Sequence, residues 1–324
     1  MELSESRGEP LDILILAAGL GTRMRSSTAK VLHLLDGRPL IAHVCHTAAS
    51  LAPRKVYVVV GHQGREVEKA VAQELPPEQT AFVLQKEQRG TGDAVNAARE
   101  YLENDDAVLL VLSGDVPVIR AETLAALIQL HRNHRGRGAA CTILTVKLKD
   151  PTGYGRIVRD AGGIFDRIVE QRDATPAETE INEINSGIYC FNARKLFRAL
   201  LRVGNHNDQG EYYLTDVPGL LKSDGEDVAI YNHADPAEVE GVNNRVQLAE
   251  LERQIRRRTC YCRRQTPPAA SRCRRRHAVP AAAIRWQIAG RHFRRRTASR
   301  RPFRRTGSCR PSCRHAPAPG HCRR

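Results

Sequence analysis

Residues 11–24 read LDILILAAGLGTRM, and the fold prediction starts from this stretch. The run 11–16 is apolar except for Asp12, and it leads into a loop with glycines at positions 19 and 21. A short apolar run that ends at glycine predicts a buried strand. Glycines in the following loop let backbone N–H groups close around an anion, and the small residues Ala17 and Ala18 let a base approach the main chain.

Two cations accompany the loop: Arg23 lies in it and Lys30 follows shortly after. Such side chains supply fixed positive charge where phosphate oxygens would bind. The loop lacks the third glycine of a dinucleotide-binding fingerprint and the GK[ST] of a P-loop. Taken alone, the spacing of the two glycines favours a glycine-rich turn that carries solvated cations.

Working outward from this loop, strand-like and helix-like segments alternate as far as residue 148. Apolar runs at 55–60, 81–85, 107–112 and 141–148 predict further strands, and amphipathic stretches at 39–51, 64–75, 91–102 and 120–134 predict helices. This alternation favours a doubly wound, mostly parallel, Rossmann-like α/β sheet with helices on both faces.

The pattern changes between residues 150 and 232. Short β-like segments at 155–158, 164–169 and 188–191 are separated by turn residues, so we expect a small antiparallel extension of the same sheet. Residues 239–257 return to a helical pattern.

The net charge of +15 comes from the end of the chain. Residues 256–324 contain 22 arginines and no lysine, aspartate or glutamate, which leaves residues 1–255 with a net charge of −7. Such a composition cannot bury enough apolar surface to fold. We therefore predict a flexible N-terminus over 1–10, one domain over 11–256 and a disordered Arg-rich tail over 257–324.

Three interpretations of the tail stay open. The sharp change in composition near residue 256 suggests translation in a shifted reading frame. The arginine clusters would bind nucleic acid nonspecifically, and the six tail cysteines could bind zinc, although their spacing is irregular.

The other cysteines and the N-terminus indicate an intracellular protein. Cys45, Cys141 and Cys190 show no pairing or metal-site spacing, as expected of buried thiols in a reducing compartment. Residues 1–10 lack a signal-peptide pattern, and the longest apolar stretch, 107–112, is too short to span a membrane. We expect a cytoplasmic protein with no membrane partner.

Several segments in fixed order carry a family resemblance. They are LAAGLGTRM at 16–24, AKVL at 29–32, QKEQRGTGDA at 85–94, GDVP at 114–117, DPTGYGR at 150–156, IVEQRDA at 168–174, EINSGI at 183–188, GEYYLTD at 210–216 and VEGVNNR at 239–245. Over about residues 11–256 the chain resembles the sugar nucleotidyltransferases. The resemblance is greatest to the N-terminal uridylyltransferase domain of the bacterial bifunctional N-acetylglucosamine-1-phosphate uridylyltransferases / glucosamine-1-phosphate acetyltransferases. Ala29 replaces the family's usual proline and Asp93 its usual histidine.

The resemblance implies transfer of UMP from UTP to N-acetyl-α-D-glucosamine 1-phosphate, with Mg²⁺, for peptidoglycan and lipopolysaccharide precursors. It implies catalytic roles for Arg23 and Lys30 and Mg²⁺ ligands at Asp115 and Asn243. The implied substrate-binding residues are Leu16, Ala17, Ala18, Gly19, Lys30, Gln85, Gly90, Thr91, Ser113, Gly114 and Asp115 with Gly155, Glu170, Asn185 and Asn243. Gly155, Glu170 and Asn185 would hold the amino sugar.

General chemistry supports the magnesium ligands that the resemblance implies. Asp115 comes directly after a predicted strand, where doubly wound sheets place ligand-binding groups, and Mg²⁺ prefers oxygen ligands. A strand-end cap at Asp115 and a helix N-cap at Asn243 are the structural alternatives.

Two functional alternatives also stay open: a nucleotidyltransferase for another sugar phosphate, and a nonproductive nucleotide-binding relative. Full-length members of the family continue into a hexapeptide-repeat β-helix that forms trimers and carries the acetyltransferase. No such repeat follows residue 258, so we expect acetyltransferase activity and the family's trimer-forming part to be absent.

Overall fold

The computed structural model describes residues 9–19 and 21–265. Contacts divide the chain into two units, Met1–Pro267 and Pro268–Arg324, and every described residue belongs to the first. The predictions made for residues 1–8 and for tail residues 266–324 therefore lie outside the described residues, including those on disorder, zinc and nucleic acid.

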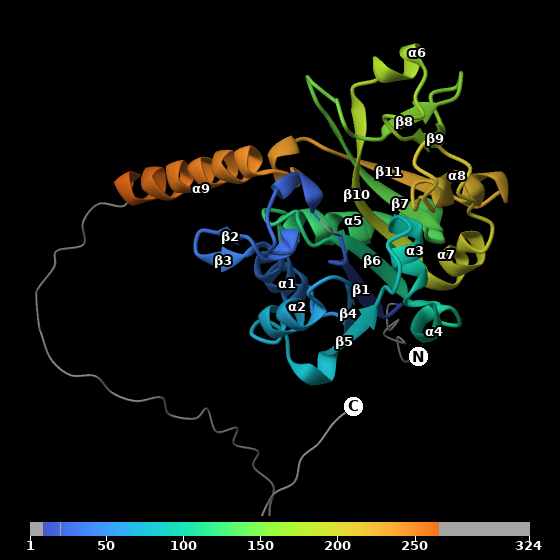
Figure 1. Cartoon of the computed structure of the whole chain (residues 1–324). Coiled ribbons are helices and arrows are strands. Elements are labelled where there is room, and N and C mark those ends of the chain that lie inside the picture. Colours follow the sequence, from blue (N-terminus) through green and yellow to red (C-terminus); the bar gives the residue numbers. More distant parts are fainter. Residues whose placement is uncertain (1–8, 20, 266–324) are drawn as a thin grey trace, which may run out of the picture. The chain divides into compact units, whose positions relative to one another are not determined.

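The described part of the chain is built around one mixed sheet of nine strands (Figure 1). The main path runs β11-β7-β10-β6-β1-β4-β5. Its strands are β1 (Leu11–Leu16), β4 (Lys55–Val60), β5 (Thr80–Leu84), β6 (Val108–Ser113), β7 (Cys141–Lys147), β10 (Glu183–Asn192) and β11 (Val228–His233). Along this main path every pairing is parallel except those of β10 with β6 and with β7. The expected doubly wound, mostly parallel sheet is confirmed.

Strand β10 differs from the expected extension in position and in length. The sequence predicted a short segment at 188–191 in an antiparallel extension, whereas β10 is longer and lies inside the sheet, between β6 and β7. Its register shifts between Asn185 and Tyr189, so the start of the strand runs on to pair with β8. The polar residues around this shift concealed the first half of the strand from the apolar pattern.

The expected antiparallel extension consists of β8 (Arg156–Arg159) and β9 (Phe165–Val169), joined to the sheet through β10. The segment 150–232 also contains elements that the sequence analysis did not predict. These are α6 (Pro176–Thr179), α7 (Ala193–Leu200), α8 (Asp216–Ser223) and the edge strand β11, which is parallel to β7. The reading of this segment as only antiparallel was therefore wrong for β11.

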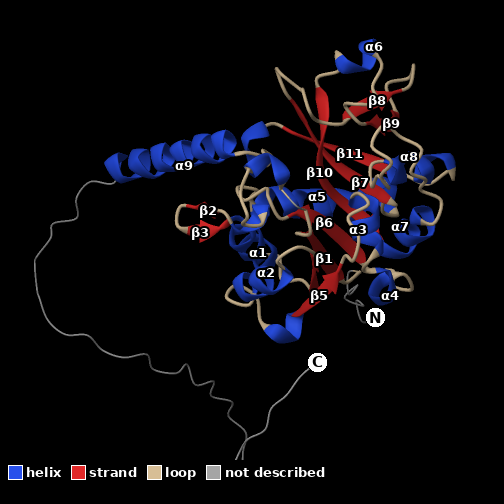
Figure 2. Cartoon of the chain, in the orientation of Figure 1, coloured by secondary structure: helices blue, strands red, loops and turns tan. Residues whose placement is uncertain are grey.

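Helices cover both faces of the sheet (Figure 2). One face packs against α1 (Leu40–Ser50), α2 (Gly64–Val71) and α5 (Ala121–Asn133), and the other against α3 (Thr91–Asn96), α4 (Arg99–Leu102), α7 and α8. Alternate residues of β1 serve the two layers: Ile13 and Ile15 lie in the first core cluster and Leu14 in the second. This alternation explains why the strand reads as a continuous apolar run.

Two helix predictions need correction. The helix expected over 91–102 is divided into α3 and α4. The helix expected over 239–257 begins only at Arg245, because residues 239–244 form a loop, and it continues as α9 (Arg245–Gln265) beyond the expected domain boundary at 256. Arginine and glutamine are good helix formers, so the change in composition at 256 does not by itself end a helix.

The remaining short elements surround the glycine loop and the sheet edges. They are the hairpin β2 (Leu34–Leu35) and β3 (Arg38–Pro39), and the single 3-10 turns η1 (Thr22–Met24), η2 (Lys30–Leu32), η3 (Pro77–Gln79), η4 (His134–Gly136) and η5 (Pro236–Glu238). A third apolar cluster joins Met24 of η1 and Leu35 of β2 to Leu251 of α9.

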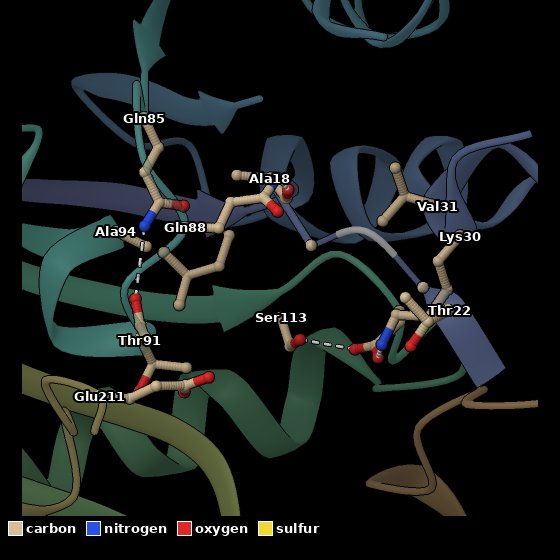
Figure 3. A pocket seen from close by; sticks show the side chains of 15 residues that line it. Ala18, Thr22, Lys30, Val31, Gln85, Gln88, Thr91, Ala94, Ser113 and Glu211 are labelled. Carbon is tan, nitrogen blue, oxygen red and sulfur yellow. Dashed lines mark hydrogen bonds and ion pairs between the residues drawn. The ribbon is translucent and has the colours of Figure 1, made fainter. Parts of the chain in front are cut away.

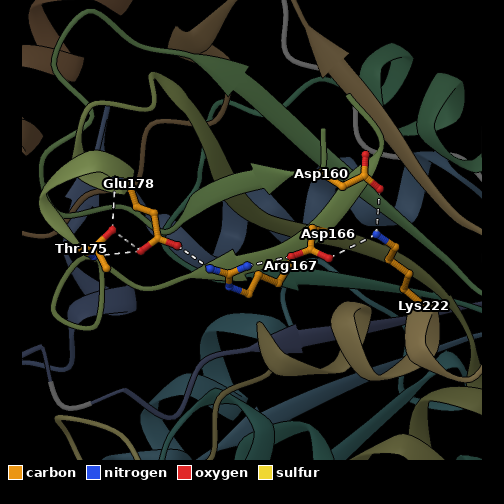
Figure 4. Close-up of polar contacts among 6 residues, drawn as sticks. All are labelled: Asp160, Asp166, Arg167, Thr175, Glu178 and Lys222. Atoms are coloured by element: carbon orange, nitrogen blue, oxygen red, sulfur yellow. Dashed lines mark hydrogen bonds and ion pairs between the residues drawn. The ribbon is translucent and has the colours of Figure 1, made fainter. Parts of the chain in front are cut away.

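Exposed charges connect the β8–β9 extension to its neighbours (Figure 4). Lys222 of α8 reaches Asp166 at 3.2 Å and Asp160 at 3.4 Å, and Arg167 pairs with Asp166 at 2.7 Å. Arg167 also reaches Glu178 at 2.6 Å, in the capping box of α6. The side chains of these ion pairs remain partly exposed to solvent, which screens the charges, so each pair contributes little to stability.

Two further predictions can be compared with the described residues. Cys45, Cys141 and Cys190 are free and buried, as expected. None of the helices over residues 9–19 and 21–265 combines the length and the apolar character that a membrane-spanning helix requires.

Candidate active site

The candidate site lies where the strand order reverses. Strand β4 follows β1 on one side and β6 pairs with it on the other, so the ends of β1 and β6 mark the switch point at which such sheets bind ligands. A cavity of about 410 Å³ opens there, which we call the glycine-loop pocket. It is lined by Leu16, Ala18, Gly19, Gly21, Thr22, Lys30, Val31, Gln85, Gln88, Gly90, Thr91, Ala94, Ser113, Asp115 and Glu211 (Figure 3).

The glycine loop packs closely against Lys30. Gly21 has a φ of 62°, and a Cβ at this position would lie 2.6 Å from the Cβ of Lys30. Only glycine combines this left-handed backbone with so close an approach. The end of the loop is held from outside by Arg245 of α9, whose Nε donates to the carbonyl oxygen of Met24 at 3.1 Å.

Lys30 joins the two residues that were predicted to bind magnesium. Its Nζ forms an ion pair with Asp115 Oδ2 and donates to Asn243 Oδ1 at 3.3 Å. The Oγ of Ser113 donates to Asp115 Oδ1 at 2.5 Å. Asp115 is 7% exposed. Tertiary structure thus brings together side chains from the segments 29–32, 113–117 and 239–245.

The far end of the pocket is formed by Gln85 and the loop that leads into α3. Gln85 is 6% exposed, and its Nε2 donates to Asp93 Oδ2 at 2.9 Å and to the Gly90 carbonyl at 3.4 Å. Gly90 has a φ of 104°, and a Cβ there would lie 2.5 Å from the carbonyl oxygen of Tyr212. Glycine is therefore required where this loop passes residues 211–212.

A second cavity of about 320 Å³ adjoins the first, and we call it the β10 pocket. Its lining includes Leu16, Arg23, Thr91, Ser113, Asp115 and Asn243 with Tyr154, Gly155, Glu170, Asn185, Tyr189 and Thr215. The Nδ2 of Asn185 donates to the Tyr189 hydroxyl at 2.7 Å, and the Thr215 hydroxyl donates to Glu170 Oε1 at 3.1 Å. Burial raises the pKa of Glu170, while the hydrogen bond from Thr215 acts in the opposite direction.

Most of the predicted site residues line one of these cavities. Leu16, Thr91, Ser113 and Asp115 line both; Ala18, Gly19, Lys30, Gln85 and Gly90 line the first; Arg23, Gly155, Glu170, Asn185 and Asn243 line the second. Ala17 and Gly114 line neither, because they are packed beneath the loops: Ala17 is 2% exposed, and a Cβ at Gly114 would lie 3.0 Å from Ile41.

Other lining residues were missed by the sequence analysis. Gln88 donates to the Ala18 carbonyl at 2.6 Å, and Glu211, Tyr189 and Thr215 come from distant segments. Gln88 lies inside the segment 85–94, and Glu211 and Thr215 lie inside the segment 210–216, so those matches were the available signal. Nothing in the local pattern marks Tyr189, which reads as a core residue of a strand.

The donor set around Asp115 fits magnesium. No group of three or more His, Cys, Asp or Glu side chains in residues 9–19 and 21–265 is arranged to hold a metal. Mg²⁺, however, often takes only one or two protein oxygens and completes its shell with water and substrate phosphates. Asp115 and Asn243 provide one carboxylate and one amide oxygen, and both already contact a cation at the same point, Lys30 Nζ.

A buried carboxylate holds the loop that carries Asn243. Glu238, 1% exposed, accepts from Arg120 Nε at 2.6 Å, Thr123 Oγ1 at 2.6 Å and His233 Nε2 at 3.1 Å. Burial by itself would raise the pKa of Glu238, but the bonds from Arg120, Thr123 and His233 lower it to about 2. This network fixes η5 against α5 and so determines where residues 239–244 run.

Comparisons with known proteins identify the family of the chain. The family model described as "Nucleotidyl transferase" matches residues 13–235. "Bifunctional protein GlmU" of Brevibacillus brevis is 46% identical over 245 residues, which cover 76% of this chain and 51% of that protein. "Bifunctional protein GlmU" of Desulfotalea psychrophila is 44% identical over 249 residues, covering 77% and 71%. The chain thus spans about half the length of the first of these relatives.

Solved structures share the fold at low sequence identity. A UDP-glucose pyrophosphorylase complexed with UDP-glucose matches with a TM-score of 0.62 at 15% identity, covering 77% of this chain and 99% of that one. A putative glucose-1-phosphate thymidylyltransferase from Bacillus anthracis matches with a TM-score of 0.58 at 18% identity, covering 76% and 95%. The family model matches more than half of the chain, and the chain belongs to the nucleotidyl transferase family.

Proposed function

We propose that this chain transfers UMP from UTP to N-acetyl-α-D-glucosamine 1-phosphate, giving UDP-N-acetylglucosamine and pyrophosphate. The choice of substrates rests on the GlmU relatives and on the segments shared with them. The glycine-loop pocket would bind the nucleotide and the β10 pocket the sugar phosphate. The reaction would take place in the cytoplasm, where UTP is made.

One observation carries the proposal: the two cavities share a wall. Leu16, Thr91, Ser113 and Asp115 line both, and Lys30 Nζ is bonded to Asp115 at this boundary. A transfer reaction needs donor and acceptor held side by side, and holding both reactants in place can itself supply several kcal/mol of the barrier reduction. A protein that bound one nucleotide as a regulator would not need the second cavity.

The chemistry needs no covalent enzyme intermediate. An oxygen of the sugar 1-phosphate attacks the α-phosphorus of UTP, a new P–O bond forms, and the bond to pyrophosphate breaks. The nucleophile is already an anion, so no side chain has to remove a proton. The work left to the protein is to align the two phosphates and to neutralise their charge.

Lys30 and Arg23 would neutralise that charge from two sides of the boundary. Lys30 lines the glycine-loop pocket and is 19% exposed through its side chain. Arg23 lines the β10 pocket and forms no ion pair with any carboxylate in the described residues, so its guanidinium is available to phosphate. Mg²⁺, held by Asp115 and Asn243, would supply further positive charge to the phosphate oxygens.

The test is pyrophosphate release from UTP and N-acetylglucosamine 1-phosphate with Mg²⁺, using the full chain. We expect turnover that is abolished by EDTA and restored by Mg²⁺. Glucose 1-phosphate in place of the amino sugar tests the acceptor. Glucosamine 1-phosphate with acetyl-CoA should give no acetyl transfer, since residues 259–324 contain no hexapeptide repeat.

Two results would contradict the proposal. Faster turnover with glucose 1-phosphate than with N-acetylglucosamine 1-phosphate would assign the chain to another sugar phosphate. Binding of UTP without any pyrophosphate release, from folded protein, would favour a nonproductive nucleotide-binding relative.

A further inference from the structure

The side-chain amide of Gln85 is held in one orientation. Its Nε2 has two N–H groups, and both are directed at oxygens of the protein: Asp93 Oδ2 at 2.9 Å and the Gly90 carbonyl at 3.4 Å. Figure 3 shows this nitrogen turned toward the start of α3 and the amide oxygen on the side of Ala18 and Gln88. An amide can usually be turned over at little cost, because its two ends are similar in size.

Here Asp93 prevents that exchange. An ionised carboxylate only accepts hydrogen bonds, so turning the amide over would place two oxygens against each other. The carboxylate is itself fixed, because Arg89 Nη2 donates to its other oxygen, Oδ1, at 3.1 Å. Arg89 in turn lies over the ring of Tyr212, with 5.7 Å between its Cζ and the ring centroid. Asp93 is only 13% exposed through its side chain, so water competes weakly for the bond.

Gln85 therefore presents to the pocket its amide oxygen, which can only accept a hydrogen bond. Uracil and thymine carry an N–H between two carbonyl groups and match an acceptor at that point. Cytosine has an unprotonated ring nitrogen there, and its lone pair would face the amide oxygen. A buried polar site rejects the wrong partner because a group is left unpaired or repelled.

We propose that Asp93 is a positioning residue that fixes the amide of Gln85 and thereby selects a pyrimidine with an imino N–H over cytosine. The inference deepens the proposed function and rests on its assignment of the glycine-loop pocket to the nucleotide. It concerns binding alone, and its test therefore does not depend on turnover.

The isosteric change Asp93→Asn gives the sharpest test. Arg89 can only donate, so it takes the single oxygen of the new amide and leaves the NH₂ group facing Gln85. Gln85 then turns over to accept from this NH₂ group, gives up its longer bond to the Gly90 carbonyl at 3.4 Å, and offers an N–H to the pocket. We expect the ratio of UTP to CTP affinity to fall by about tenfold or more, whereas the ratio of UTP to dTTP stays unchanged. Asp93→Leu, which removes the carboxylate without replacing it, should also lower the first ratio.

Glu87→Gln is the matched control. Glu87 is the other carboxylate beside Arg89, at 3.5 Å, and its side chain is 70% exposed and makes no bond to Gln85 in the described structure. This variant removes the same charge but should keep both ratios. Affinities for UTP, CTP and dTTP are measured by calorimetry with Mg²⁺, and circular dichroism checks that each variant is folded.

The results separate the inference from the proposed function. Wild-type ratios in both Asp93 variants would overturn the inference and leave the uridylyltransferase proposal standing. A wild-type chain that binds UTP and CTP equally would overturn it as well. If the wild type binds none of the three nucleotides, the assignment of the pocket fails and the inference fails with it.

Discussion

The glycine-loop pocket and the β10 pocket are built in different ways. The first is formed around the glycine loop and the ends of β1, β5 and β6, whose positions follow from the parallel sheet. The second is formed largely by residues from β10, from the segments just before β8 and just after β9, and from the loops before α8 and α9. The first pocket depends on close backbone approaches at Gly21 and Gly90 as well as on side-chain bonds such as that of Gln85, whereas the second depends mainly on hydrogen bonds between side chains. Substitutions should therefore act differently in the two.

The largest effect should come from the wall that the pockets share. In Lys30→Met, we expect the turnover number to fall by about 10²–10³-fold, the range for loss of one preorganised charged donor. Asp115 would also lose its partner, so the KM values of both substrates should rise. Pyrophosphate release measures both quantities. Lys55→Met is the control, because Lys55 donates only to the carbonyl of Glu78. If only one of the two KM values changed, Lys30 would act on one substrate alone, which would contradict a boundary that contacts both.

The next effect tests the backbone side of the comparison. Gly21→Ala places a Cβ 2.6 Å from Lys30 Cβ at a φ of 62°. We expect kcat/KM for UTP to fall by about 10–100-fold, since the loop must move away from Lys30. Gly37→Ala is a matched control with a φ of 79° and nothing within 4 Å of the added Cβ. It should lose only about 1 kcal/mol of stability. Equal effects on activity would contradict a role for the close contact.

A third prediction concerns the loop that joins the two pockets through Asn243. Removing the charge in Glu238→Gln should cost about 2 kcal/mol of unfolding free energy at pH 7. The difference between the folded and unfolded pKa of Glu238 corresponds to a larger free energy, which we reduce because Arg120 is exposed and solvent screens its charge. The folded pKa of about 2 lies below the ordinary 4.5. The contribution is therefore present above about pH 4.5 and is lost as the pH falls toward 2.

Urea unfolding of both proteins at several pH values measures this contribution. The gap between wild type and Glu238→Gln should narrow below pH 4.5. Glu122→Gln, an exposed change at the start of the same helix α5, should show no such gap. A gap that stays constant down to pH 3 would mean that the network does not hold the charge of Glu238.

A smaller effect is expected in the β10 pocket. Tyr189→Phe removes the hydroxyl that accepts from Asn185 Nδ2 at 2.7 Å. Loss of one buried hydrogen bond corresponds to about 1 kcal/mol, or about fivefold. We expect the KM for the sugar phosphate to rise by that factor while the KM for UTP stays the same. Tyr101→Phe, an exposed ring, is the control. Equal changes in both KM values would contradict the assignment of the two substrates to separate pockets.

The smallest effect belongs to the charges on the β8–β9 extension. Lys222→Ala breaks its contacts with Asp160 and Asp166 (Figure 4). Exposed ion pairs contribute little, so the unfolding free energy should fall by less than about 0.5 kcal/mol, and 0.5 M salt should abolish the difference. A loss of several kcal/mol would show that surface charge, and not the packing of Phe165 and Ile168, holds the extension in place.

Local patterns along the chain were sufficient to predict the parallel strands of the sheet except the edge strand β11. Strands such as β1 are buried on both faces and read as apolar runs, and the glycines at 19 and 21 mark the loop at the end of β1. Short-range patterns were sufficient because each of these features lies within a few neighbouring residues. The family segments then added site residues, most of which line the two cavities.

Tertiary structure alone decided the features that depend on distant partners. It placed β10 inside the sheet, divided the helix at 91–102 and brought Lys30 against Asp115 and Asn243. It also gave Asp93 a partner in Gln85, which no local pattern could reveal. A hydrogen bond or an ion pair across the sheet depends on which two chain segments lie next to each other in space. The periodicity of residues along one segment does not identify the other segment.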